Sequence, residues 1–207
     1  FATMQRTSQT FKIHNIDLFK EQLLLWAQQF KTAVWLDSNN YSQKHSSFDA
    51  ILAVDSYSFV ESNYQNAFQQ LKTYQTEVQD YIFGYLGYDL KNDVENLTSN
   101  NIDALHFPDL FFFQPKKIFL LKGTSIEVKY ISELENEIKT DFENIYATTN
   151  NQLQKTNTKV KIKLRIHKEE YFQKIQTILN HIHRGNIYEV NFCQEFYSEN
   201  SIINPID

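Results

Sequence analysis

The amino-acid sequence predicts an α+β fold in which antiparallel sheets carry helices on their outer faces. Two patterns indicate it: some segments alternate apolar and polar residues as strands do, and others repeat apolar residues at the spacing of a helix. Strand-like segments also follow one another through short turns, which favours antiparallel pairing. The chain has 207 residues, of which 42% are hydrophobic and 15% aromatic. It is therefore long enough to bury a core, and its composition excludes a disordered chain.

The first part of the chain contains four expected strands and two expected helices. Asn15 is a favoured N-cap residue, and Phe19, Leu23 and Trp26 follow it on one helical face. A second helix is expected over about 61–79. The expected strands are 9–14, 32–37 (which we expect to be buried), 48–55 and 81–90, with a polar loop over 38–47 and an irregular polar stretch over 91–108.

A β-hairpin and a third helix are expected next. Residues 110–121 and 125–131 read as two strands that are joined by a short turn at 122–124, which contains a glycine. Ser132 and Glu135 have the spacing of a capping box, in which each side chain bonds the other residue's backbone amide. We therefore expect a helix to begin at this point.

The composition then changes in a way that indicates a domain boundary. Residues 147–158 are rich in Thr, Asn and Gln, which favours a linker between an N-terminal region, 4–146, and a second region, 159–207. The expected elements of the second region are a half-exposed strand over 160–166, a helix over 168–184 that stops at Gly185, and a strand over 187–196.

Charge and hydropathy restrict the partners and the location of the protein. The formal net charge is −5, which argues against nucleic acid as the main partner because phosphate binding needs clustered Lys and Arg. No apolar run reaches the roughly 18 residues of a membrane helix, so we expect no membrane partner. Cys193 is the single cysteine and cannot form an internal disulfide. These observations predict a cytoplasmic protein.

No self-sufficient catalytic group of residues is evident. His181 and His183 are two apart on a predicted helix, so their rings point to different faces and are expected to be solvated rather than to share a metal. Cys193 lies among aromatic residues and is expected to be a small core residue. Gly84 and Gly87 lack the pattern of a nucleotide-binding loop. We expect them to allow close backbone packing instead.

Four stretches carry more specific information. Residues 35–38 (Trp-Leu-Asp-Ser) are followed, eleven residues after the serine, by Asp49. Residues 83–90 form an aromatic stretch with two glycines, and residues 107–113 combine Pro-Asp with a run of phenylalanines. Residues 184–196 read Arg-Gly-Asn-Ile-Tyr-Glu-Val-Asn-Phe-Cys-Gln-Glu-Phe. Together, and in this order, these stretches resemble the N-terminal part of the chorismate-utilising enzymes, most closely aminodeoxychorismate synthase component I, with anthranilate synthase component I as the near relative.

This resemblance implies a fold, a reaction and partners. The fold is the N-terminal half of a four-layer α/β/β/α architecture. The reaction converts chorismate, with ammonia from glutamine, to 4-amino-4-deoxychorismate for para-aminobenzoate and folate synthesis. The implied cofactor is magnesium, and the implied partner is a glutamine amidotransferase subunit. Three alternatives remain: an anthranilate synthase component I, a non-catalytic module that binds tryptophan or the amidotransferase, and an unrelated α+β domain whose motifs are fortuitous.

The resemblance also indicates where the chain departs from the family and what it lacks. Asn186, Glu189 and Glu195 stand where the family usually has Asp, Gln and Arg. The family's catalytic residues, including the glutamates that hold magnesium, are expected beyond Asp207, so the 207 residues alone are expected to be inactive. A sheet cut after Phe196 would leave apolar side chains and backbone groups unpaired, which predicts self-association or marginal stability.

The family's N-terminal region carries an aromatic amino-acid site. Carried over to this sequence, Ser38 contacts the carboxylate or amino group of tryptophan, and His45, Ser46, Ser47 and Phe48 form the near wall. Ser47 stands where the family usually has an arginine. The alternative interpretation is that Ser38 caps a turn and Phe48 belongs to the core, and the sequence favours neither of the two.

Overall fold

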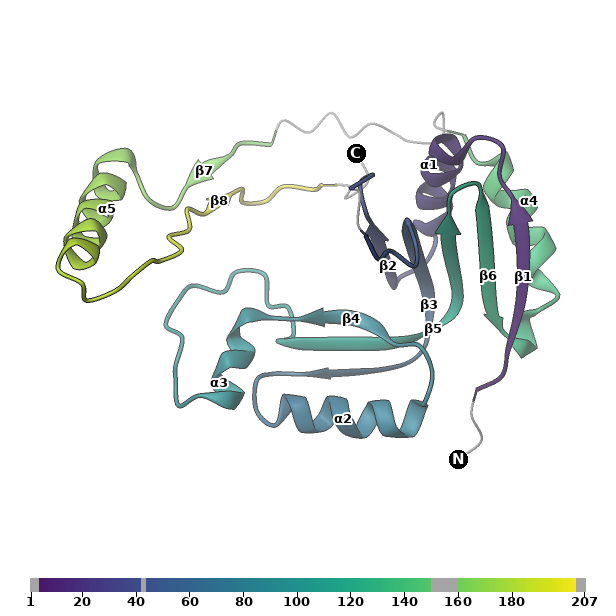
Figure 1. Cartoon of the computed structure of the whole chain (residues 1–207), viewed down its shortest axis with the longest axis horizontal. Helices are drawn as coiled ribbons and strands as arrows, with labels where there is room; N and C mark the ends of the chain where they lie inside the picture. The colour runs from purple at the N-terminus through teal and green to yellow at the C-terminus, as the bar shows by residue number, and fades with distance from the viewer. Residues whose placement is uncertain (1–3, 42–43, 150–159, 204–207) are drawn as a thin grey trace. The chain divides into compact units, whose positions relative to one another are not determined.

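The computed structural model describes residues 4–41, 44–149 and 160–203, and the chain divides into two compact units, Phe1–Gln152 and Leu153–Asp207 (Figure 1). The N-terminal region expected over 4–146 lies within the first unit. Of the expected linker, residues 150–158 lie outside the described residues, and residue 147 is the last residue of a helix.

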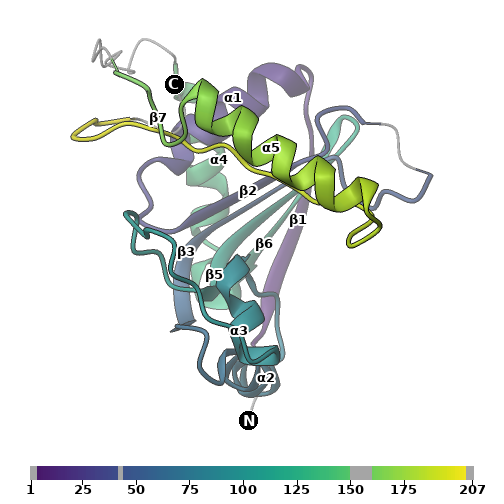
Figure 2. The same cartoon turned by 90° about the vertical axis from the view of Figure 1, so that its left-hand side faces the viewer.

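The first unit contains an antiparallel sheet, as the alternating patterns predict. Figure 1 and Figure 2 show its strands side by side. The strand order is β1-β6-β5-β3-β2, and β4 pairs with β5 outside this path. The strands are β1 (Arg6–Lys12), β2 (Ala33–Asp37), β3 (Ala50–Ser62), β4 (Phe83–Leu86), β5 (Leu110–Lys122) and β6 (Ser125–Ile131). Together with the helices, this sheet confirms the α+β class.

A bulge divides the two longest strands into two halves. The register between β3 and β5 shifts between Ser56 and Ser58, next to Asp55, whose φ is +62°. On one side of the bulge, β3 also pairs with β2, and β5 also pairs with β6. On the other side, β5 pairs with β4 as well as with β3. The sheet therefore changes its neighbours at the bulge, as bulges at functional and structural bends commonly do.

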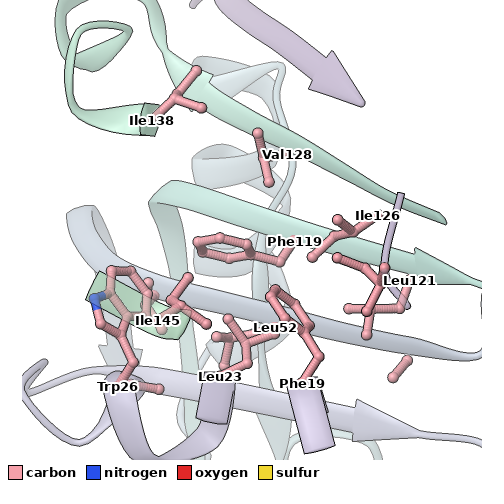
Figure 3. Close-up of a cluster of buried hydrophobic side chains, with 14 of the residues drawn as sticks. Phe19, Leu23, Trp26, Leu52, Phe119, Leu121, Ile126, Val128, Ile138 and Ile145 are labelled. Carbon is pink, nitrogen blue, oxygen red and sulfur yellow. The ribbon is translucent and has the colours of Figure 1, made fainter. Parts of the chain in front are cut away.

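Two helices cover one face of the half that contains β2 and β6. They are α1 (Ile16–Ala27) and α4 (Glu137–Ala147). The Asn15 side chain accepts a hydrogen bond from the amide of Leu18 at 3.1 Å, which confirms the predicted N-cap. Apolar side chains from both helices and from alternate residues of the strands form the main core (Figure 3). Its labelled members are Phe19, Leu23, Trp26, Leu52, Phe119, Leu121, Ile126, Val128, Ile138 and Ile145.

A smaller core lies in the other half of the sheet. There α2 (Ala67–Val78) packs against β3 and β5, and a 3-10 turn (Tyr88–Leu90) leads into the short helix α3 (Lys91–Val94). The buried residues of this second core are Ala67, Leu90 and Leu110, with Val60, Leu71 and Phe112 packed against them.

The two glycines of residues 83–90 pack closely against β5, as predicted. A Cβ on Gly84 would lie 1.9 Å from the carbonyl oxygen of Phe111, and one on Gly87 would lie 2.9 Å from the carbonyl oxygen of Asp109. The Gly87 amide also donates to that Asp109 oxygen at 2.6 Å. Glycine is therefore required at position 84 because the backbone of β5 occupies the space of a side chain.

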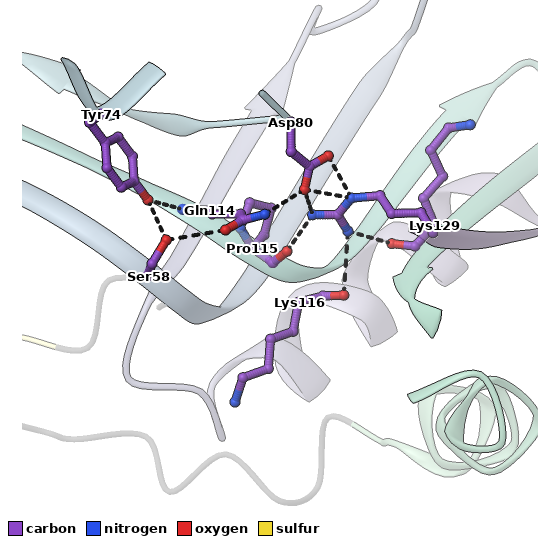
Figure 4. Close-up of polar contacts among 8 residues, drawn as sticks. Ser58, Tyr74, Asp80, Gln114, Pro115, Lys116 and Lys129 are labelled. Carbon is purple, nitrogen blue, oxygen red and sulfur yellow. Dashed lines mark hydrogen bonds and ion pairs between the residues drawn. The ribbon is translucent and has the colours of Figure 1, made fainter. Parts of the chain in front are cut away.

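A buried ion pair joins β1 to the segment before β4 (Figure 4). The Arg6 guanidinium donates to both carboxylate oxygens of Asp80, at 2.7–3.0 Å, and to the carbonyl oxygens of Pro115 at 2.6 Å and Lys129 at 3.3 Å. The Gln114 side-chain amide donates to the same carboxylate at 2.8 Å. The Arg6 and Asp80 side chains are only 7% and 6% exposed. Each charge is thus paired and hydrogen-bonded, as burial requires.

The network continues from Gln114 towards α2. The Ser58 hydroxyl donates to the Gln114 side-chain oxygen at 3.1 Å and shares a 2.8 Å hydrogen bond with the Tyr74 hydroxyl. The backbone amide of Gln114 donates to that same tyrosine oxygen at 3.0 Å. Tyr74 therefore connects α2 to the bulged part of the sheet.

Within its described residues, 160–203, the second unit contains one helix and two short strands. Its strands β7 (Lys163–Leu164) and β8 (Phe196–Tyr197) pair over two residues each. Helix α5 (Lys168–His183) has no buried residue, and its two histidines are exposed, as predicted. Gly185 follows the helix with φ +75°, which confirms the expected glycine stop.

Four expectations about the first unit are wrong in detail, and the strand expected over 81–90 is one of them. Only Phe83–Leu86 form a strand there, and Tyr88–Leu90 form a 3-10 turn instead. The strand expected to be buried over 32–37 is β2, which lies at the end of the sheet, so that Leu36 is 51% exposed. The helix expected over 61–79 begins only at Ala67, because β3 continues to Ser62 through its pairing with β5. The place of β2 at the end of the sheet and the pairing of β3 with the distant strand β5 decide these outcomes, and periodicity reports neither.

The predicted capping box is also wrong. Ser132 begins a 3-10 turn, and α4 begins at Glu137 after Asn136, which makes no side-chain cap hydrogen bond. The Glu135 carboxylate instead accepts a hydrogen bond from the Thr7 hydroxyl of β1 at 2.9 Å. A contact with another strand thus replaces the local bond that the spacing predicts.

The expected strands of the second unit are much shorter than the alternation predicts. Only two residues of 160–166 and one residue of 187–196 lie in a described strand, because a ladder needs a partner along its whole length. Cys193 is exposed, so the interpretation of this residue as a core residue is wrong.

Candidate aromatic amino-acid site and the family motifs

The site that the sequence places around Ser38 lies in the loop between β2 and β3. Ser38 directly follows β2, and its amide donates to the carbonyl oxygen of Asp49 at 2.9 Å. Its own carbonyl oxygen accepts from the amide of Tyr41 at 2.9 Å, so Ser38 also begins a turn. The two ends of the loop therefore lie side by side, with Ser38 at one end next to Asp49 at the other.

The segment 45–48 is arranged by one local hydrogen bond and one from the neighbouring hairpin. The Ser46 hydroxyl donates to the carbonyl oxygen of Phe48 at 2.7 Å. The Lys122 ammonium donates to the carbonyl oxygen of Ser46 at 3.1 Å. The side chains of His45, Ser47 and Phe48 are exposed. Phe48 is therefore not a core residue, and an apolar ring next to polar hydroxyls faces solvent here.

Asp49 connects this loop to the turn between β5 and β6. Its carboxylate accepts from the amide of Gly123 at 2.6 Å and from the Lys122 ammonium at 3.1 Å. Its own amide donates to the carbonyl oxygen of Leu121 at 2.8 Å. The hydrogen bond from the Gly123 amide and then the bond and charge of Lys122 hold the pKa of Asp49 below its usual range. The sequence marks Asp49 only as part of a motif, and its partners are 73 and 74 residues away.

A hollow at the bulge of β3 escaped the sequence interpretation. It has a volume of about 520 Å³ and combines aromatic walls, Tyr57, Phe59 and Phe111, with the charged Lys31 and Glu61. The Phe59 and Phe111 rings lie 6.0 Å apart. No sequence signal could have located it, because its walls come from residues that are far apart in the sequence, such as Lys31, Phe59 and Phe111.

The described residues do not fit a magnesium ion. No group of three or more His, Cys, Asp and Glu side chains in the ranges 4–41, 44–149 and 160–203 could hold a metal. The carboxylates of Asp49, Asp80 and Asp89, for example, are occupied by ammonium, guanidinium, amide or hydroxyl donors. We therefore derive no chemical step through a metal from these residues.

The motif stretches of the first unit adjoin in pairs. Strand β4, from residues 83–90, pairs with β5, from residues 107–113, with Phe83 opposite Phe113 and Leu86 opposite Leu110. Residues 35–38 likewise meet Asp49 at the neck of the β2–β3 loop. Residues that are separated in the sequence thus form two contiguous structural elements.

Comparison with known protein families gives the decisive observation: the chorismate binding enzyme family matches residues 24–207. The chain belongs to the chorismate-binding enzymes. No curated protein matches the sequence. None of the helices in the part of the chain that the structure describes is long and apolar enough to cross a membrane.

Residues 184–196, the last of the four stretches that resemble the family, lie in the second unit. Arg184 is the C-cap residue of α5, and Glu195 directly precedes β8. Glu195, for which the resemblance implies an arginine, accepts two hydrogen bonds from Arg165 at 2.8 and 3.0 Å. The Arg165 guanidinium also lies 4.0 Å from the centre of the Tyr197 ring. The carboxylate of Glu195 is thus paired with a cation of its own unit, Arg165.

Proposed function

We propose that this chorismate-binding enzyme chain serves the amination of chorismate to 4-amino-4-deoxychorismate, for para-aminobenzoate and folate synthesis in the cytoplasm. Ammonia comes from a glutamine amidotransferase subunit, and magnesium is the cofactor of the complete enzyme. The family match over residues 24–207 carries this proposal. We choose this reaction over anthranilate formation on the overall resemblance to aminodeoxychorismate synthase component I. Residues 83–90 and 107–113, which resemble two stretches of the chorismate-utilising enzymes, pair with each other as β4 and β5.

The 207 residues supply a scaffold in this proposal, and the reacting groups come from elsewhere. The resemblance places the magnesium-holding glutamates and the general acid after the motif at residues 184–196. Both groups are needed, since the metal stabilises developing negative charge and the acid assists the departure of the ring hydroxyl. We therefore expect the 207 residues alone not to aminate chorismate.

The experiment compares two proteins under the same conditions. The purified 207-residue chain and the product of the complete reading frame are each incubated with chorismate, ammonium and magnesium, and the products are separated by chromatography. We expect 4-amino-4-deoxychorismate from the complete product and no product from the 207 residues. Formation of anthranilate would replace the proposed reaction with the second one, and amination by the 207 residues would contradict their scaffold role.

A second candidate function is the binding of tryptophan at the β2–β3 loop, and the closed neck of that loop favours it. The bond between the Ser38 amide and the Asp49 carbonyl brings Ser38 to the end of the segment 45–48. An exposed ring, Phe48, and several hydroxyls there can offer an apolar contact and polar contacts to a zwitterion. Ser38→Ala is expected to weaken tryptophan binding about tenfold in calorimetry, as for the loss of one hydrogen bond to a charged group.

A further inference from the structure

The described residues of the loop that would hold the aromatic amino acid, 38–41 and 44–48, have few attachments to the rest of the first unit. At its neck the Ser38 amide bonds the Asp49 carbonyl, and the Asn39 amide donates to the Asp37 carboxylate at 2.8 Å. Asn39 and Asn40 have φ values of +49° and +59°, so the chain turns sharply after β2. These contacts close the loop on itself but do not fix its direction relative to the sheet.

Asp49 provides the attachment that fixes this direction. Its carboxylate receives the Gly123 amide and the Lys122 ammonium, and its amide bonds the Leu121 carbonyl. The turn that supplies these donors is itself rigid, because it joins two paired strands and its glycine adopts the left-handed φ of +54°. Lys122 then bonds the Ser46 carbonyl, so the same hairpin also contacts the wall of the loop.

We infer that Asp49 is the positioning residue of the candidate aromatic amino-acid site: it anchors the loop of Ser38 and residues 45–48 to the β5–β6 turn. This inference rests on the proposed tryptophan site, but it assigns to Asp49 a role that does not involve touching the ligand. The ordering cost of the loop is met by the hydrogen bonds to the hairpin before a ligand arrives, and such preorganisation raises affinity.

The test combines calorimetry with limited proteolysis. Lys44 is exposed within the loop, so trypsin cleavage after it reports how often the loop leaves its anchored position. We expect Asp49→Ala to raise the rate of this cleavage about tenfold and to weaken tryptophan binding about tenfold, with no change in the far-ultraviolet spectrum. Asp49→Asn keeps an oxygen for the Gly123 amide, so its cleavage should be slower and its tryptophan binding tighter than those of Asp49→Ala.

Two controls separate the possible outcomes. Asp103→Asn changes an exposed carboxylate whose contacts are the amides of Leu105 and His106 and the His106 ring of its own loop, and it should leave cleavage and binding unchanged. If the unaltered chain binds tryptophan and Asp49→Ala binds it equally well, the positioning role is wrong while the site stands. If the unaltered chain gives no heat with millimolar tryptophan, the site is wrong and the role of Asp49 in it falls too. Unchanged cleavage in Asp49→Ala would show that Asp49 does not anchor the loop.

Discussion

Replacement of Asp80 by alanine is expected to destabilise the first unit strongly. Asp80 is the only carboxylate among the described residues that bonds the buried Arg6 guanidinium, whose other acceptors are backbone carbonyls. Removal of one partner leaves an uncompensated buried charge, which costs about 3–5 kcal/mol. Both side chains are more than nine-tenths buried, so solvent offers little compensation.

The smaller change Asp80→Asn keeps the shape of the side chain and removes its charge. It is expected to cost about 2 kcal/mol, the scale of a hydrogen bond that involves charged groups. Burial raises the pKa of Asp80, but the hydrogen bonds from Arg6 and Gln114 outweigh burial and leave this pKa below its usual range. A depressed folded-state pKa adds stability above the unfolded pKa of about 4, and this stability is lost as pH falls through the folded value.

The assay is urea unfolding followed by far-ultraviolet circular dichroism, at pH 7 and again at acidic pH. The difference in the free energy of unfolding between the unaltered chain and Asp80→Asn should have its full value at pH 7 and should become smaller as the pH falls. Asp103→Asn, in an exposed loop, serves as the control and should leave the midpoint unchanged. A cost below about 1 kcal/mol for Asp80→Ala would refute the reasoning, because a paired, buried charge cannot lose its partner so cheaply.

Three further predictions concern packing, a buried lysine and association. Gly84→Ala should cost about 3 kcal/mol in urea unfolding, because its Cβ would overlap the Phe111 carbonyl oxygen, and an unchanged midpoint would contradict this close approach. Lys117→Met should also lower the free energy of unfolding by about 3 kcal/mol at pH 7. The Lys117 ammonium lies 2.6 Å from the Asp141 carboxylate, which would lose its buried cation. A melting temperature equal to that of the unaltered chain would contradict this prediction. The second unit should cause concentration-dependent association in sedimentation velocity, because Tyr188 is 94% exposed among other apolar side chains, and a monomer at all concentrations would exclude this.

The parts of the fold that could be predicted are those set by local signals. Asn15 caps α1, and Gly123 allows the turn of the β5–β6 hairpin, so both elements appear where the sequence places them. The extent of β3 could not be predicted, because its last residues are strand only through pairing with β5. Glu135 shows the same limit, since the hydroxyl that it bonds belongs to a strand 128 residues earlier.

For the candidate site, the position of its loop could be predicted from the sequence, and the attachment of that loop could not. The spacing of Ser38 and Asp49 indicates a loop between two strands, and the structure closes that loop with one backbone bond. The sequence does not reveal that the Gly123 amide bonds the Asp49 carboxylate, because only the register between β3 and β5 places them together. The need for glycine at position 84 was predictable, whereas the β5 carbonyl that imposes it was not.

The bulge in β3 also determines how the first unit is expected to open. Because the strands change neighbours there, α1 and α4 pack over one hydrophobic cluster of fifteen buried residues, and α2 packs over another that has three. Because the smaller cluster buries fewer apolar side chains, local unfolding of α2 should require less free energy than unfolding of α1. Amide hydrogens of α2 should therefore exchange with solvent while those of α1 stay protected. Strands β3 and β5 thereby connect two cooperative regions of unequal stability. The bulge marks the boundary at which the region of α2 can unfold while the region of α1 and α4 stays folded.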